Sequence, residues 1–182
     1  MRVCSRGRNI WDGRLESWTH IGNVGEELGL IDIELDPIET RRIVAGILNN
    51  LSDVDASMTP FDAGLGDFVD LDRDDDFFGQ DALRMADRRT RRFGLGFTSG
   101  EPLIGAAVTR DGVEIGLATA GSWSPHFGCG IGYVRLHSAD ELEPRRASVI
   151  GFDLAEHACD IVDLPFYDAD KKIPRGLETP IV

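Results

Sequence analysis

Asp111 to Val134 reads DGVEIGLATAGSWSPHFGCGIGYV, and this stretch decides the fold of the second half of the chain. Its first two residues, Asp111-Gly112, lie between two alternating apolar runs, Leu103 to Thr109 and Val113 to Ala118. Asp-Gly in that setting predicts a β-hairpin, because a type I′ turn needs a positive φ at both central residues. We therefore expect two antiparallel strands joined by a two-residue turn.

A segment rich in glycine, serine and proline follows the hairpin, from Gly121 to Gly128. Pro125 has no N–H group for a strand ladder, and the flanking glycines allow backbone turns that other residues avoid. The pattern predicts that no strand continues through this segment and that the sheet bends or changes partner there.

Short β-like segments make up most of residues 93–164, with turn residues and no helix between them. This spacing is typical of a small antiparallel barrel or sandwich. The tail 171–182 is expected to be a surface strap. The predicted strands are residues 93–98, 103–109, 113–118, 131–137, 147–152 and 158–164.

The region before residue 93 carries one strand signal and two helix signals. Leu28 to Leu35 alternates apolar with acidic residues, as a half-buried strand does. Asp36-Pro37 with Glu39 is a strong helix start, in which Asp36 caps and Glu39 reaches back in a capping box. The apolar stripe of this helix is Ile43, Val44, Ile47 and Leu48, and Asn49-Asn50 is predicted to end it.

A second helix is predicted from about Gly79 to Arg89, packed through Leu83 and Ala86. The arginines at its end are expected to complement the helix dipole. Residues 1–25 show no sustained period of 2 or 3.6 and are left unassigned. The acidic run Asp70 to Asp76 has neither the glycine nor the final glutamate of a calcium loop, which favours a solvated acidic turn.

The bulk properties exclude several classes of protein. A net charge of −13 argues against a nucleic-acid partner, since such proteins carry a basic face. The three cysteines, at positions 4, 129 and 159, do not form a secreted disulfide framework. No window approaches a membrane span, and the N-terminus lacks a signal-peptide run. We expect a cytoplasmic protein of 182 residues with no nucleic-acid or membrane partner.

Two histidine–cysteine pairs are the only candidate metal ligands, His126 with Cys129 and His157 with Cys159. Zinc sites favour paired spacings such as C-x2-C, and these pairs fall on separate β segments. A surface histidine and two buried thiols explain them better, so no metal site is predicted. Ser122 lies outside any G-x-S-x-G elbow, which leaves no candidate hydrolase nucleophile.

Two stretches in the first half resemble the glycine cleavage T-protein (aminomethyltransferase) superfamily of folate-binding proteins. Residues 42–48, RIVAGIL, with Asp53 downstream, are similar to the R-x-E-A-G helix of that family. Residues 59–66, TPFDAGLG, followed by residues 78–83, FGQDAL, are similar to its P-x-E-A-G-L and F-I-G-x-E-A-L stretch.

Two more stretches extend the resemblance through the second half. Gly116 through Ser124-Pro125 to Gly132-Tyr133-Val134 is similar to the family's G-x-x-T-S-G-x-x-S-P-x-L-G-K … G-Y-V signature. Leu164 to Asp168, LPFYD, is similar to its closing P-F-Y. The four matches occur in the family's order over residues 26–176, which makes them more specific together than singly.

The resemblance implies an α+β chain in which a partial folate-binding domain, a strand plus two helices, precedes a C-terminal antiparallel β-barrel. The expected boundaries are an unassigned segment 1–25, the folate-domain remnant 26–90 and the barrel domain 91–182. The family's catalytic aspartate lies upstream of everything matched here. No catalytic residue is therefore assigned.

The implied function is that of the C-terminal part of a tetrahydrofolate-dependent aminomethyltransferase, which transfers a one-carbon unit to folate. Tetrahydrofolate is the implied cofactor, and a lipoyl carrier protein or an upstream-encoded half is the implied partner. Arg175 is the candidate cofactor-binding residue, because family members bring a basic or aromatic residue toward folate near this end; an exposed tail arginine is the alternative.

Several positions depart from the T-protein pattern. Ile38 stands in place of a folate-contacting arginine, Val44 in place of the glutamate of R-x-E-A-G, and Cys129 in place of the lysine of G-K. The form R-R-I-x-A-G-I-L-N is nearer to the demethylase-like branches. Two alternatives therefore stand beside the aminomethyltransferase: a folate-dependent demethylase similar to dimethylsulfoniopropionate demethylases, and a non-catalytic barrel that binds a partner.

Overall fold

The computed structural model describes residues 10–31, 35–73, 75–173 and 175–178, without the side chains of residues 10–14. The chain divides into two compact units, residues 1–37 and 38–182. In the described part of the chain, no helix is both long enough and apolar enough to cross a membrane.

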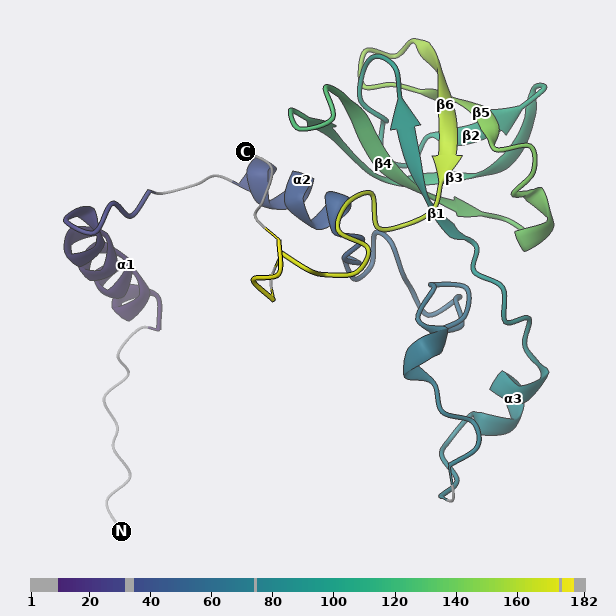
Figure 1. The fold of residues 1–182 in the computed structure, drawn as a ribbon, viewed down its shortest axis with the longest axis horizontal. Coiled ribbons are helices and arrows are strands. Elements are labelled where there is room, and N and C mark those ends of the chain that lie inside the picture. The colour runs from purple at the N-terminus through teal and green to yellow at the C-terminus, as the bar shows by residue number, and fades with distance from the viewer. Residues whose placement is uncertain (1–9, 32–34, 74, 174, 179–182) are drawn as a thin grey trace. The chain divides into compact units, whose positions relative to one another are not determined.

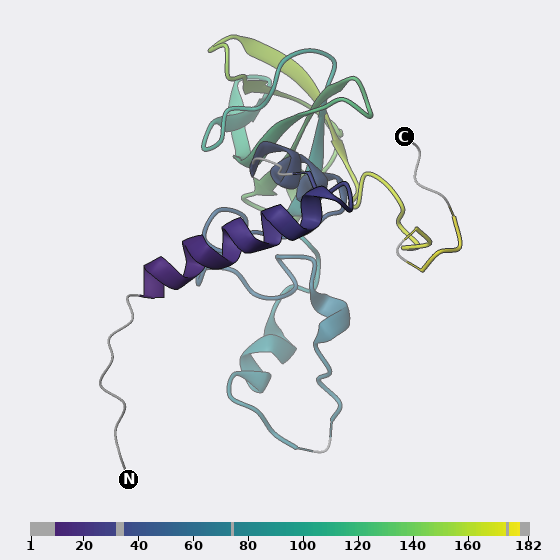
Figure 2. The ribbon, with the colours of Figure 1, turned by 90° about the vertical axis from the view of Figure 1, so that its left-hand side faces the viewer.

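The first unit contains one helix, α1 (Ile10–Glu26), in the segment that the sequence left unassigned (purple in Figure 2). Its large apolar side chains recur every three residues, at Leu15, Trp18, Ile21 and Val24, and all four are exposed. Three residues turn an α-helix by about 300°, so these side chains spread around the axis instead of forming one stripe. That spacing explains why no helical period was visible in the sequence.

The predicted strand Leu28 to Leu35 is wrong at the positions that the structure describes. Leu28 and Gly29 lie in a turn, Leu30 and Ile31 have no strand assignment, and Leu35 already begins a helix; residues 32–34 lie outside the described residues. The side chains of Leu28 and Ile31 are 84% and 80% exposed. Alternation predicts a strand only where a neighbouring strand can pair, and every strand assigned in the described residues belongs to the barrel.

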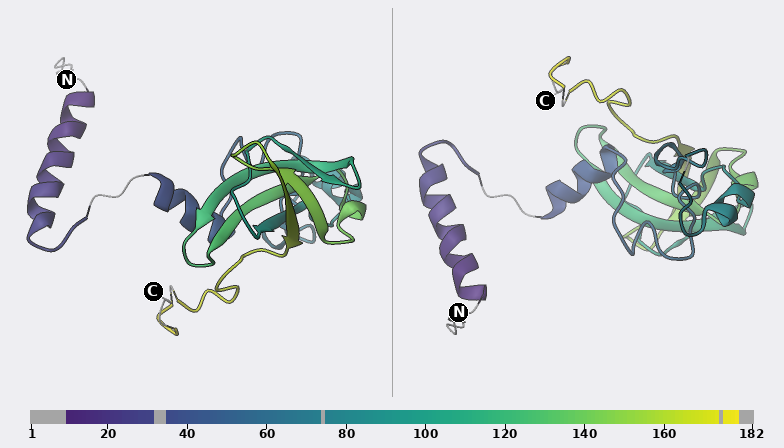
Figure 3. Two further views of the ribbon diagram at one scale, coloured as in Figure 1. Left: turned by 90° about the horizontal axis from the view of Figure 1, so that it is seen from above. Right: turned by 90° about the horizontal axis from the view of Figure 1, so that it is seen from below.

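The second unit is built on a closed six-stranded antiparallel barrel (Figure 1; Figure 3). The strands follow the order β1-β4-β3-β2-β5-β6, and β6 pairs with β1 to close the ring. Their bounds are β1 Arg92–Phe97, β2 Ala107–Arg110, β3 Val113–Ser124, β4 Cys129–Leu136, β5 Arg146–Ile150 and β6 Glu156–Val162. The α+β class and the C-terminal barrel are thus confirmed, and closure decides between barrel and sandwich.

The Asp-Gly hairpin is confirmed, because Asp111 and Gly112 have φ values of 51° and 77° between β2 and β3. The prediction for the next segment is wrong in part. β3 continues to Ser124, and only Pro125 to Gly128 form the turn into β4. A β-bulge between Ala118 and Ala120 takes up the bend that was expected from the glycines.

Three glycines of β3 and β4 have a packing role. An added Cβ at Gly130 would overlap the carbonyl of Gly100, and at Gly132 it would lie 2.7 Å from Cγ of Pro102. Gly121 likewise faces the carbonyl of Pro102. The loop 100–102 can therefore lie against the β3–β4 pair only because these positions carry no side chain.

The barrel encloses one apolar core that includes residues from all six strands. Leu95 and Val108 are fully buried in it, as is Leu136. Closure leaves no free strand edge, which removes a route to aggregation. The buried members are Phe93, Leu95, Phe97, Val108, Ile115, Ala118, Val134, Leu136, Ala147, Val149, Cys159 and Ile161.

The predicted helix at Asp36 is present as α2 (Leu35–Val44), but it ends before Asn49-Asn50. Gly46 has a φ of 72°, its N–H donates to the carbonyl of Ile43, and the N–H of Ile47 donates to that of Arg42. This is a Schellman ending, in which glycine takes the left-handed position. Glu39 does not form the expected capping box and bonds Arg42 instead.

The second predicted helix is α3 (Gln80–Met85), which is shorter than expected. It ends before Arg88 and Arg89, so the arginines do not complement its dipole as predicted. Arg89 instead forms ion pairs with Asp87 at 2.7 Å and with Asp140 at 2.5 Å.

Candidate functional site

Tyr133 on β4 lies where residues from the matched stretches meet. Its hydroxyl is placed to donate to the carbonyls of Arg42 and Ile43, each at 3.0 Å, and of Ile47 at 3.2 Å. The carbonyls of Arg42 and Ile43 belong to the last turn of α2, where backbone acceptors lose their intrahelical partners, and Ile47 follows the helix. Tyr133 is fully buried, and burial raises the pKa of its phenol well above the usual value. The phenol is therefore a fixed donor that holds the end of α2 on the barrel.

A buried ion pair lies beside Tyr133. Arg42 donates from Nη1 to Oδ2 of Asp53 at 2.6 Å and from Nε to Glu39 at 2.7 Å. Asp53 is completely buried and also accepts the Asn49 N–H at 2.8 Å, while its Oδ1 has no partner among the described residues. Burial lowers the pKa of Arg42, but its bonds to Glu39 and Asp53 raise it overall. Asp53 thus fixes both the guanidinium and the chain that follows α2.

A second arginine ties the segment 59–66 to the same place. Arg92, at the start of β1, donates to the carbonyls of Ala63 at 3.0 Å and Gly46 at 3.4 Å. Its guanidinium carbon lies 5.2 Å from the centre of the Tyr133 ring, and that of Arg42 lies at 5.7 Å. Burial lowers the pKa of Arg92, and the faces of aromatic rings attract such cations.

The neighbouring Arg91 adds a partly buried ion pair to Asp62 at 2.7 Å. Asp62 also accepts the N–H and the hydroxyl of Thr59, both at 2.9 Å. Together these bonds hold the TPFDAGLG stretch in place against the first strand of the barrel.

The closing LPFYD stretch reaches the same junction from the other end of the barrel domain. The Phe166 N–H donates to the carbonyl of Val44 at 3.1 Å, and Pro165 lies against Gly46. A Cβ on Gly94 would meet the Phe166 ring at 2.7 Å, so this ring packs directly on the backbone of β1. At the β3–β4 turn, the ring of His126 contacts that of Tyr167 in a tilted arrangement, with 5.1 Å between the ring centres.

Residues from all four matched stretches therefore meet around Tyr133. We call Arg42, Asp53, Arg92, Tyr133 and Phe166 the Tyr133 junction. Its polar groups bond to one another and to backbone carbonyls, which suits them to fix the geometry of the surrounding segments. Tyr133 and Arg42 lie in the matched motifs, but the sequence alone predicts no role for them. The contacts of Tyr133 reach across about 90 residues, which no local pattern reveals.

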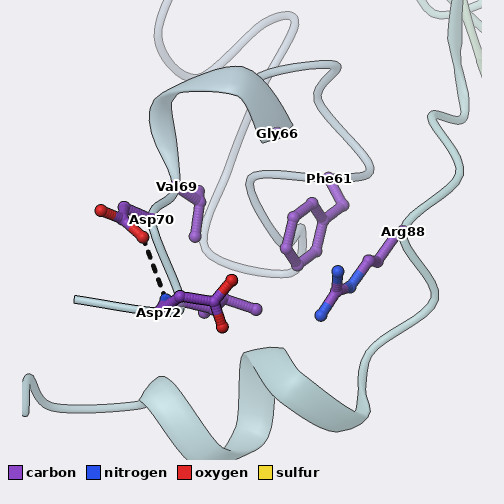
Figure 4. Close-up of a pocket in the computed structure, with 7 residues that line it drawn as sticks. Phe61, Gly66, Val69, Asp70, Asp72 and Arg88 are labelled. Atoms are coloured by element: carbon purple, nitrogen blue, oxygen red, sulfur yellow. Dashed lines mark hydrogen bonds between the residues drawn. The ribbon is translucent and has the colours of Figure 1, made fainter.

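A shallow pocket of about 310 Å3 lies near the TPFDAGLG stretch (Figure 4). Phe61 and Arg88 lie on one side of it, and Asp70 and Asp72 on the other. The Arg88 guanidinium carbon is 5.9 Å from the centre of the Phe61 ring. The pocket thus combines an aromatic face with charges of both signs.

Arg175, the predicted cofactor-binding residue, is not brought to the Tyr133 junction by any contact of the described residues. Its guanidinium is exposed and donates to the carbonyls of Lys171, at 2.9 Å, and of Asp170. These bonds close a turn within the tail, and a role in cofactor binding stays a prediction.

The histidines and cysteines take separate environments. Cys159 is buried in the barrel core, and burial raises the pKa of its thiol to about 12. His157 bonds Asp153 at 2.8 Å, and His126 belongs to the aromatic contacts at the β3–β4 turn. Over the described ranges, no three His, Cys, Asp or Glu side chains are grouped so as to hold a metal ion.

Comparison with known proteins connects this architecture to one family. Residues 91–168 match the family model of the glycine cleavage T-protein C-terminal barrel domain. An aminomethyltransferase of Clostridium botulinum (strain Kyoto) is 38% identical over 122 residues, which are 64% of this chain and 33% of that protein. The aminomethyltransferase of Streptomyces avermitilis is 31% identical over 163 residues, which are 85% of this chain and 43% of that protein.

The chain thus spans less than half the length of these curated relatives. A solved structure shares the fold, the glycine cleavage system aminomethyltransferase T from Bartonella henselae. The TM-score is 0.68 at 22% identity, and the match covers 85% of this chain and 44% of that one. Residues 91–168 therefore match the glycine cleavage T-protein C-terminal barrel domain, and the chain is similar to the C-terminal part of such a protein.

Proposed function

We propose that this chain supplies the C-terminal part of a tetrahydrofolate-dependent aminomethyltransferase, which transfers a one-carbon unit to folate. In this proposal residues 26–90 are the end of the folate-binding domain and residues 91–182 are the barrel domain. The catalytic aspartate of the family would come from polypeptide upstream of the matched region, and the chemical step would take place there.

The observation that carries the proposal is the Tyr133 junction. It joins α2 and the TPFDAGLG segment, both of which resemble the folate-binding domain, to the barrel. The bond from the Tyr133 hydroxyl to Ile43 is buried, and the bond from Arg92 to Ala63 is partly buried. A binding site must hold the groups that contact its ligand within about 0.5 Å of the productive geometry. The contacts of the junction support this proposal because they tie these segments to the barrel.

Arg175 fits the anionic tail of a folate. Its guanidinium uses Nε and Nη2 to bond the carbonyls of Lys171 and Asp170, and a guanidinium has five N–H donors. The remaining donors have no partner among the described residues and can take a carboxylate, which arginine binds in a bidentate geometry. When bound, tetrahydrofolate would supply the acceptor for the one-carbon unit, and this chain would orient its tail.

Isothermal titration calorimetry with tetrahydrofolate tests the proposal, first on this chain alone and then with the protein encoded upstream of it. We expect binding at least in the second case, and weaker binding for Arg175→Gln with the charge-preserving Arg175→Lys as the control. Absence of binding in both cases would end the proposal. The demethylase alternative predicts the same folate binding and differs only in the donor of the one-carbon unit. Assays that offer different one-carbon donors to the folate-binding form therefore distinguish the demethylase from the aminomethyltransferase.

One observation favours a second candidate, a stand-alone binding module. The barrel is closed and has its own buried core, and Ile43 from the apolar stripe of α2 is completely buried beside Ala120, Ile131 and Tyr133. Ile31 and Ile47 do remain exposed, at 80% and 58%. A module predicts a monodisperse chain that melts in one cooperative step, whereas aggregation of the purified chain would count against it.

A further inference from the structure

A second pocket lies at the far end of β3 and takes no part in the Tyr133 junction. It measures about 410 Å3 and is lined by Gly100, Glu101, Trp123, Phe152 and Asp153. The lining comes from three separate segments: the loop after β1, the end of β3 and the turn between β5 and β6. Two aromatic and two acidic residues therefore line one pocket, with no cationic residue among those that line it.

Backbone and side-chain bonds hold the lining residues in position. The Phe152 N–H donates to the carbonyl of Glu101 at 2.8 Å, which joins the loop after β1 to the β5–β6 turn. Asp153 accepts from His157 at 2.8 Å and from the Ala155 N–H at 3.1 Å. A site that is ordered before binding loses less entropy when a ligand arrives.

Trp123 lines this pocket together with residues of the loop 100–102. It pairs with Gly130 across β3 and β4, and Gly130 carries no Cβ that would push the carbonyl of Gly100 away. Trp123 is 41% exposed and Phe152 is 75% exposed, so both rings present area to solvent although both are anchored through their backbones. Both rings can therefore contact a ligand that enters the pocket.

The charges of the pocket select the ligand. Asp153 already has His157 as a partner, but the carboxylate of Glu101 has no hydrogen bond or ion pair to any residue that the structure describes. The faces of tryptophan and phenylalanine rings attract cations, and sites of this kind recognise alkylated ammonium groups. We propose that this pocket binds an alkylammonium cation between Trp123 and Phe152, with Glu101 as its counter-ion. The same group could be carried by a small amine or by a lysine side chain of another protein.

Tryptophan fluorescence of the full-length chain tests this proposal. The variant Trp11→Phe/Trp18→Phe leaves Trp123 as the only tryptophan, because the chain has three. Titration with tetramethylammonium should give a saturable change in emission, and tert-butyl alcohol, a neutral molecule of similar shape, should not. An acetylated trimethyl-lysine peptide run in parallel shows whether the site accepts the group from a protein chain or only from a free amine.

Substitutions in the same background separate the two attractive forces. Glu101→Gln and Phe152→Leu should each weaken tetramethylammonium binding by about two- to fivefold, the range expected of an exposed ion pair or cation–π contact. Asp67 and Phe68, which are adjacent in the sequence, lie outside the pocket lining and offer matched controls. Asp67→Asn and Phe68→Leu should leave tetramethylammonium binding unchanged. A response that is linear, that is equal with tert-butyl alcohol, or that Glu101→Gln leaves intact would overturn the proposal.

Discussion

Replacing Asp53 with alanine should destabilise the second unit strongly, because it breaks the buried part of the Tyr133 junction. The side chains of Asp53 and Arg42 are 0% and 12% exposed, and their ion pair is 2.6 Å long. Removing one member of a buried pair costs about 3–5 kcal/mol when the other charge is left without compensation. Arg42 keeps its ion pair with the partly exposed Glu39, whereas the Asn49 N–H loses its acceptor, so we expect the lower part of this range.

The chain contains a matched control for this experiment. Arg145 also contacts two carboxylates, Glu143 at 3.2 Å and Asp163 at 2.9 Å, but the Asp163 side chain is 74% exposed. An exposed pair of this kind contributes little to stability. Asp163→Ala should therefore leave the free energy of unfolding unchanged within error, although it removes the same chemical group from the same kind of arginine.

Urea unfolding followed by Trp123 emission in the Trp11→Phe/Trp18→Phe background would measure both variants. If Asp53→Ala does not fold, Asp53→Asn gives the answer, since the amide keeps an acceptor for Arg42 or for the Asn49 N–H and should lose less. A loss below about 1 kcal/mol for Asp53→Ala would show that the buried pair does not hold the segment after α2, and would refute the structural role given to the junction.

Three further outcomes follow from individual groups. Burial raises the pKa of the Cys159 thiol to about 12, whereas Cys129 is only partly buried. In the native protein at pH 8, iodoacetamide should therefore alkylate Cys129 well before Cys159, as measured by peptide mass spectrometry. Equal rates would contradict the burial of the Cys159 side chain. Burial raises the pKa of Asp62, but bonds from Arg91 and Thr59 lower it overall below 3.8. The stabilisation by the Asp62 carboxylate is therefore present above about pH 4 and is lost as the pH falls through the folded pKa. Asp62→Asn should flatten the pH dependence of urea unfolding below pH 4, and an unchanged slope would argue against this ion pair. Gly94→Ala places a Cβ 2.7 Å from the Phe166 ring, so amide hydrogen exchange should quicken around Phe166 while the interior of β3 stays protected.

Local sequence signals were enough for the features that depend on a few neighbouring residues. The Asp-Gly turn, the start of α2 near Asp36-Pro37 and the β character of residues 93–164 each follow from backbone preferences within the segment. The order of the four matched stretches added the barrel and the family. The first predictions succeeded because they depend on local backbone energies. The prediction of the barrel and the family succeeded because the matched motifs resemble those of known proteins.

Tertiary contacts decided the remaining features. β3 runs on to Ser124 because β4 pairs with it as far as Cys129. α2 ends at Val44, and the left-handed Gly46 that follows it lies against Pro165. Leu28 to Ile31 form no strand, since alternation without a partner stabilises nothing. Tyr133 reaches Ile43 across 90 residues, and Arg92 reaches Gly46 across 46. The sequence by itself determined which segments could be strands, turns and helix starts. Only the closed barrel determined which polar groups form the Tyr133 junction, because it brings groups that are distant in the sequence together out of water.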